Sequence, residues 1–82
     1  MLYMVIEIFR DGAEPVYRRF HEKGRMLPEG LVYVDSWVTE GMKRSYQLMS
    51  TDSPELLKKW MAEWDDLVLF EVSPLISSQQ AE

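Results

Sequence analysis

Tyr17, His21 and Arg25 follow one another at intervals of four residues. A helix places residues four apart on one flank, so a phenol, an imidazole and a guanidinium would stand in a row. The row could grip a small anion, and His21, the only histidine, could carry a proton near neutral pH. Alternatively, the row borders the buried side of the helix, with Tyr17 partly buried and Arg25 capping carbonyl groups near the helix end.

Glu7 interrupts a mostly apolar run over residues 2–9. A carboxyl group on an apolar surface that a second subunit covers is suited to proton transfer, because burial disfavours its ionised form. Alternatively, Glu7 forms an ion pair or hydrogen bond with the partner chain, or lies close enough to an edge to reach water. Asp35 and Glu71 are expected on edge strands, where solvent is still closer.

A set of large aromatic residues recurs at strand and helix positions, where Tyr46, Trp60 and Trp64 follow Tyr33 and Trp37. They could line a pocket for a planar ligand, although aromatics at helix and strand spacing usually form simple core. The candidate ligand contacts are Glu7, His21, Arg25, Tyr33 and Trp37.

No local motif specifies a reaction. One histidine, no cysteine and scattered carboxylates give no metal-ligand spacing. There is no glycine-rich phosphate loop and no nucleophile elbow. We therefore expect neither a metal nor a cofactor, and the sequence leaves open whether the protein is an enzyme.

Composition favours a soluble, folded, cytoplasmic protein. The 82 residues are 46% hydrophobic and 28% charged, as in ordinary globular domains. A net charge of −5 has the wrong sign for holding a phosphate backbone, so nucleic acid is not an expected partner. The apolar N-terminal run is too short for a membrane span or a signal peptide. We expect one domain over residues 1–76 and a frayed tail over 77–82.

Hydrophobic periodicity and turn residues predict four strands and two helices. Pro15 suits only the first turn of a helix, Glu40-Gly41 suits a hairpin turn, and Ser53 or Asp52 can cap the helix that starts near Pro54. The predicted strands are 2–9, 31–39, 43–49 and 67–75, and the predicted helices are about 14–26 and about 55–64.

This order predicts an α+β protein with the ferredoxin-like βαββαβ fold, a four-stranded antiparallel sheet with both helices on one face. Because residues 2–9 are apolar on both sides, we expect a second copy to cover the open face, as in a dimeric α/β barrel. To the helix side we assign Met4, Ile6, Val32, Val34, Val68, Phe70 and Val72. To the open side we assign Tyr3, Val5, Phe9, Tyr33, Trp37, Met49 and Leu69, with Glu7, Asp35, Gln47 and Glu71 between them.

Residues 17–20 read Tyr-Arg-Arg-Phe, and residues 24–31 read Gly-Arg-Met-Leu-Pro-Glu-Gly-Leu, with Tyr33, Ser36 and Trp37 shortly after. In these residues, and in 4–7 and 67–72, the chain resembles a family of small microbial proteins known as domain of unknown function 3303. The resemblance covers nearly the whole chain. It implies a dimeric α/β barrel, a fold that also hosts cofactor-free monooxygenases, stress-related barrel proteins and amino-acid-sensing modules, and it implies no catalytic role for any residue.

Three functions are consistent with these observations. The first is a homodimeric protein that binds a small organic molecule between sheet and helices or within the dimer barrel. The second is an enzyme resembling the cofactor-independent monooxygenases, with His21 or Glu7 as base. The third is a structural or protein-interaction module without catalysis. A closed cavity of roughly 300 Å³ or more would support ligand binding.

Overall fold

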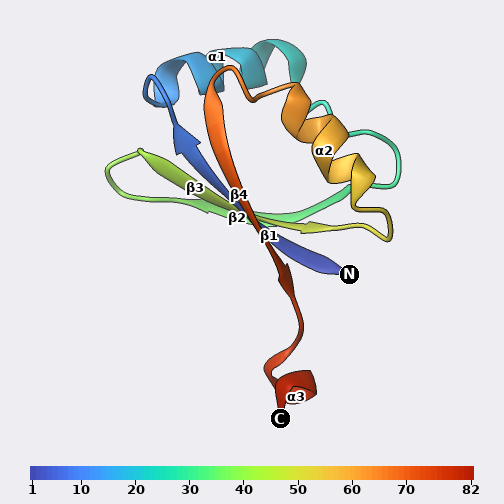
Figure 1. The fold of residues 1–82 in the computed structure, drawn as a ribbon. Helices are drawn as coiled ribbons and strands as arrows, with labels where there is room; N and C mark the ends of the chain where they lie inside the picture. Colours follow the sequence, from blue (N-terminus) through green and yellow to red (C-terminus); the bar gives the residue numbers. More distant parts are fainter.

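The computed structural model describes residues 1–82 (Figure 1). The chain forms an α+β fold with one four-stranded antiparallel sheet, in which the strands lie in the order β2-β3-β1-β4. The elements follow the predicted order, with one short helix added at the end. They are β1 (Leu2–Phe9), α1 (Ala13–Lys23), β2 (Val32–Val38), β3 (Arg44–Ser50), α2 (Glu55–Ala62), β4 (Val68–Leu75) and α3 (Ser78–Ala81).

The central strands carry the residues that matter for the site. β1 pairs with β3 on one side and with β4 on the other, so Glu7 lies opposite Ser45 and opposite Phe70. β2 is an edge strand paired only with β3, and its register shifts between Tyr33 and Asp35. Such an irregularity re-aims side chains along a strand.

The two long helices lie together on one face of the sheet (Figure 1). α1 ends at Lys23 rather than near Met26, because Gly24 takes a φ of 68° and a ψ of −160°, a combination that is almost confined to glycine. Arg25 therefore lies beyond the helix and not in a row with Tyr17 and His21. At α2 the predicted side-chain cap is also wrong, since no side chain of residues 52–54 caps the helix.

The predicted assignment of the sheet faces is partly wrong. The helices cover the side of β1 that carries Tyr3, Val5 and Phe9, while Met4 and Ile6 lie on the open side. Tyr33, Met49 and Gln47 also belong to the helix side, whereas Val68, Phe70 and Val72 were placed correctly. Both sides of β1 are apolar, so a period of two identifies the faces without saying which one the helices choose. The buried core consists of Tyr3, Val5, Phe9, Val16, Leu31, Met49, Leu57, Trp60, Trp64 and Val68.

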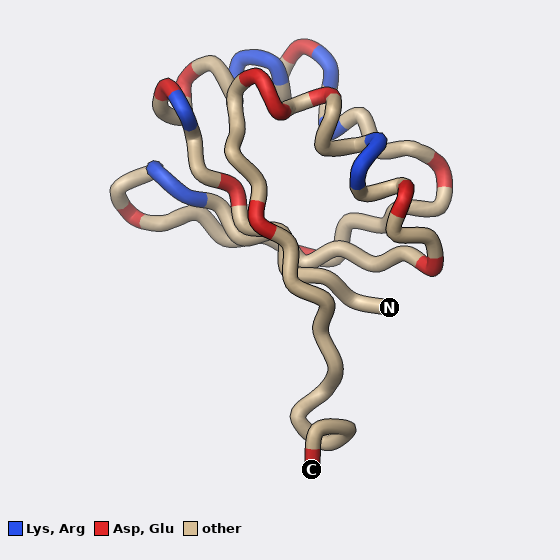
Figure 2. The backbone as a smooth tube through the Cα atoms, in the orientation of Figure 1, with Lys and Arg blue, Asp and Glu red and all other residues tan.

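The open face of the sheet remains apolar. Trp37 and Tyr46 are register partners there, and Trp37 and Leu69 are half exposed. Only 14 of 82 residues are buried, so the chain hides little of its apolar surface by itself. Figure 2 shows that the charged residues gather along the helices and loops, while the end of the sheet near the chain termini carries few.

A solvent-exposed ion pair joins α1 to the loop after α2. The Arg19 guanidinium donates two hydrogen bonds to the Asp66 carboxylate, at 2.7 and 2.6 Å, and a third to the Glu63 carbonyl at 2.9 Å. The C-terminal residues that were expected to fray include α3, whose first turn is closed by a capping box between Ser77 and Gln80. No helix is both long and apolar enough to cross a bilayer.

Candidate functional site

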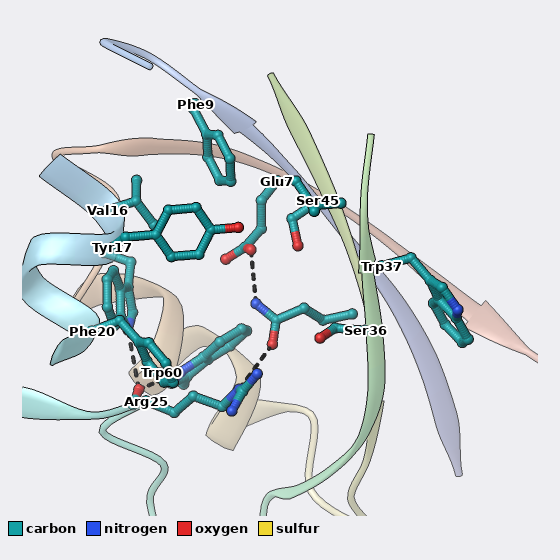
Figure 3. Close-up of a pocket in the computed structure, with 13 residues that line it drawn as sticks. Glu7, Phe9, Val16, Tyr17, Phe20, Arg25, Ser36, Trp37, Ser45 and Trp60 are labelled. Carbon is teal, nitrogen blue, oxygen red and sulfur yellow. Dashed lines mark hydrogen bonds between the residues drawn. The ribbon is translucent and has the colours of Figure 1, made fainter. Parts of the chain in front are cut away.

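A partly open cavity of about 160 Å³ lies between the sheet and the two long helices (Figure 3). Three strands contribute its polar groups, with Glu7 on β1, Ser36 on β2, and Ser45 and Gln47 on β3. The apolar wall comes mostly from aromatic rings. The remaining lining residues are Phe9, Val16, Tyr17, Phe20, Arg25, Trp37, Val38, Trp60 and Trp64.

Glu7 is the buried acid of this cavity. Its residue is only 5% exposed, and its Oε1 accepts a hydrogen bond of 2.7 Å from Nε2 of Gln47. Burial raises the pKa of Glu7, while hydrogen bonds from Gln47 and Ser45 and the positive charge of Arg25 partly oppose that rise. Figure 3 shows the Tyr17 hydroxyl pointing toward this carboxyl group.

Gln47 connects Glu7 to Arg25. Its amide nitrogen faces Glu7, and its amide oxygen accepts a long hydrogen bond of 3.4 Å from Nε of Arg25. The two partners fix which way the amide points, because only the oxygen can accept from a guanidinium. The result is a polar chain across the cavity that begins at a carboxyl group and ends at a cation.

Aromatic rings hold the Arg25 guanidinium in place. Its Cζ lies 3.6 Å from the ring centroid of Tyr33 and 5.1 Å from that of Phe20. A planar guanidinium stacks well on such faces. Tyr33 is itself fixed, since its hydroxyl lies 2.6 Å from Oγ of Ser36.

The backbone of Arg25 is anchored independently of its side chain. The Arg25 carbonyl oxygen accepts hydrogen bonds from the indole nitrogens of Trp60 and Trp64, at 2.9 and 3.1 Å. Gly24 and Met26, on either side, both have positive φ angles, which turn the chain sharply at this point. The two tryptophans thus satisfy their buried N–H groups and position the arginine loop at the same time.

Residues 1–82 match the family described as Domain of unknown function (DUF3303). The chain belongs to this family. No curated protein and no solved structure matches it.

The structure of this DUF3303 protein brings together three of the five predicted contacts. Glu7 and Arg25 line the cavity, and the ring of Tyr33 stacks against the Arg25 guanidinium. Trp37 lies at the cavity wall, but the residue is 53% exposed and its indole points away from the cavity, toward the open face (Figure 3). His21 is exposed on α1, outside the cavity, with its ring against Phe20.

Gln47 and Ser45 were missed as site residues of this DUF3303 protein. A signal existed for Gln47, because Glu7 and Gln47 each place a polar group within an apolar alternation, on strands that the fold makes neighbours. Sequence reasoning placed Glu7 and Gln47 on the open face, where a second subunit and not the helices would have covered them.

The arrangement in the DUF3303 chain has the groups needed to bind a ligand and to transfer a proton. Glu7 offers a carboxyl group with a raised pKa, Arg25 offers fixed positive charge, and the aromatic wall excludes water from an apolar ligand. No group of three or more histidine, aspartate or glutamate side chains is placed to hold a metal ion.

Proposed function

We propose that this DUF3303 protein is a homodimer that binds a small organic molecule in the cavity between its sheet and helices. The observation that carries the proposal is Glu7, a buried carboxyl group that faces a cavity instead of packed side chains. Glu7, Gln47 and Arg25 supply the polar contacts. The fold itself gains little from such a group, because burying a carboxyl costs free energy that an apolar residue of similar size would not.

The size of the cavity limits the ligand. A volume of about 160 Å³ is below the roughly 300 Å³ at which pockets for drug-sized ligands begin. It is close to the roughly 150 Å³ of an engineered apolar cavity that takes up benzene. The proposed ligand is therefore a molecule of about one ring in size.

The open face of the sheet supports the homodimer. The centre of that face carries Met4, Ile6 and Leu48. The half-exposed Trp37 and Leu69 lie on either side of them. Soluble monomers rarely leave a contiguous apolar surface of this kind in water. We propose that a second copy covers it, that the βαββαβ order with strands β2-β3-β1-β4 is ferredoxin-like, and that two such sheets form a dimeric α/β barrel.

A second candidate is an enzyme resembling the cofactor-independent monooxygenases. The raised pKa of Glu7 and its place in the cavity favour it, because a base must lie within reach of its substrate. In that case Glu7 removes a proton from an electron-rich substrate. His21 has no such place, since it lies outside the cavity.

Native mass spectrometry of protein taken directly from cells tests the proposal, because it reports subunit number and retained ligand together. We expect a dimer with a small molecule bound. Val16→Phe fills the cavity from α1 and should abolish retention, whereas Val34→Phe, the same change at an exposed position outside the cavity wall, should not.

A natural protein that carries no molecule and a Val16→Phe variant that behaves identically would contradict ligand binding. A dimer without ligand, whose exterior still exposes an apolar patch, would favour the third candidate, a protein-interaction module.

A further inference from the structure

Arg25 presents an unused guanidinium edge at the cavity. Its Nε donates to Gln47, but Nη1 and Nη2 form no hydrogen bond within the protein, and none of the three ion pairs includes Arg25. Every fully buried side-chain nitrogen and oxygen has a partner, so these two unpartnered nitrogens are not fully buried. They belong to a residue that lines the cavity.

The two arginines of α1 do not share this property. Arg18 pairs with Glu14, and Arg19 pairs with Asp66. Arg25 instead has aromatic rings on its faces and an amide oxygen on its Nε, so no carboxylate of the chain neutralises it directly. The closest acid along the polar chain, Glu7, is held behind Gln47, and burial favours its neutral form by raising its pKa.

The guanidinium is also fixed in advance. The Tyr33 ring lies 3.6 Å from its Cζ, and the loop that carries it is tied by its carbonyl to Trp60 and Trp64. A cation that is already ordered loses little conformational freedom on binding. Its free edge has the forked geometry that matches the two oxygens of a carboxylate.

We infer that the cavity takes a small organic acid, whose carboxylate lies on the free edge of Arg25 and whose apolar body lies against the aromatic wall. The inference rests on the proposed function and specifies its ligand class. The wall contains Phe9, Phe20 and Trp60, and the volume of about 160 Å³ suits a single ring.

Benzoate and benzamide test the inference, because they share size and shape and differ in charge. Titration of the isotope-labelled protein followed by NMR should show benzoate shifting the resonances of cavity residues. Benzoate should bind about tenfold or more tightly than benzamide, since charge-assisted hydrogen bonds are stronger than neutral ones.

Arg25→Gln should remove this preference, and Arg25→Lys should retain only part of it, because lysine keeps the charge and loses the fork. The loop should survive both changes, since it is held by the main-chain carbonyl of residue 25. Arg18→Gln, at an exposed position outside the cavity, is the matched control and should leave the preference unchanged.

Equal binding of benzoate and benzamide in the cavity would overturn the inference and leave small-molecule binding intact. Benzoate that shifts resonances only outside the cavity, or a preference that Arg25→Gln leaves unchanged, would also overturn it. A neutral molecule retained in native mass spectra would have the same consequence. A cavity that binds neither probe and retains nothing from cells would overturn the proposed function as well.

Discussion

The Nε2 of Gln47 lies 2.7 Å from Oε1 of Glu7, although 40 residues separate the two in the chain. They sit on adjacent strands, β3 and β1, and both project beneath the helices. The bond partly offsets the desolvation of the carboxyl group, and the remaining effect of burial still raises its pKa. Several properties of the protein depend on this pair and on the loop that carries Arg25.

Glu7 should make the stability of the folded protein depend on pH. Its pKa is raised by folding, so at low pH both states are protonated and its contribution is complete. As pH rises above the ordinary range of glutamate, the unfolded chain loses the proton first, and stability falls until the folded pKa is passed. The loss is about 1.4 kcal/mol for each unit of upward shift in the pKa.

The Glu7→Gln variant cannot titrate at this position. The unfolding free energies of the natural protein and of this variant, measured by denaturation across pH, should therefore diverge in this window. Parallel pH profiles would contradict a raised pKa.

Gln47→Leu should destabilise the protein by about 1 to 3 kcal/mol, because it leaves the Glu7 carboxyl group buried without its main donor. It should also raise the pKa of Glu7 further, which carboxyl-labelled NMR titration measures, since the Gln47 hydrogen bond lowers that pKa. Gln79→Leu is the control, because Gln79 is exposed on α3. A Gln47→Leu protein as stable as the natural one would show that the bond contributes nothing.

Trp60→Phe and Trp64→Phe should each cost about 1 to 3 kcal/mol of unfolding free energy, because each removes an indole donor and part of a buried side chain. In each single variant the Arg25 carbonyl keeps one partner. The double variant leaves it with none, so its cost should exceed the sum by about 0.5 kcal/mol or more. Urea denaturation measures these costs. If the cost of the double variant equals the sum of the two single costs, the loss of the last partner of the Arg25 carbonyl carries no extra penalty, and the prediction is contradicted.

Gly30→Ala and Gly24→Ala should both destabilise the chain by about 1 to 3 kcal/mol, because both positions have positive φ. They differ in their surroundings. A Cβ at Gly30 would lie 2.9 Å from Cδ1 of Leu56, whereas one at Gly24 would meet nothing within 4 Å. Leu56→Ala should therefore relieve part of the cost of Gly30→Ala and none of the cost of Gly24→Ala. Double-mutant cycles from denaturation midpoints measure this difference, and equal coupling in both cycles would contradict the contact.

Ile6→Lys should convert the proposed dimer into a folded monomer. Ile6 lies on the open face of the central strand, opposite Tyr46 and Glu71, so a lysine there has an acidic neighbour in the monomer and would be buried in the dimer. Sedimentation at micromolar concentration gives the subunit number. Glu22→Lys, a charge change on the exposed side of α1, is the control and should stay dimeric. A natural protein that sediments as a stable single subunit would contradict the dimer.

The arrangement of elements could be predicted because its signals are local. The β1 strand begins and ends at the predicted residues, and Pro15 lies in the first turn of α1 as expected. The end of α1 could not be placed as well, since it depends on the conformation that Gly24 adopts. The next residue, Arg25, is held through its carbonyl by the indoles of Trp60, on α2, and Trp64, just beyond α2, and both lie far along the chain.

By itself the sequence determined the strands, the helices, the apolar character of both sheet faces and the presence of Glu7 and Arg25 as unusual groups, because periodicity and residue chemistry act over a few neighbours. Only the tertiary structure decided that the helices cover the face with Tyr3, Val5 and Glu7, and that Gln47 joins Glu7 to Arg25. The reason is physical: when both faces of a strand are apolar, local pattern leaves the choice to the packing of whole helices. That choice turned a predicted dimer surface into the wall of a cavity.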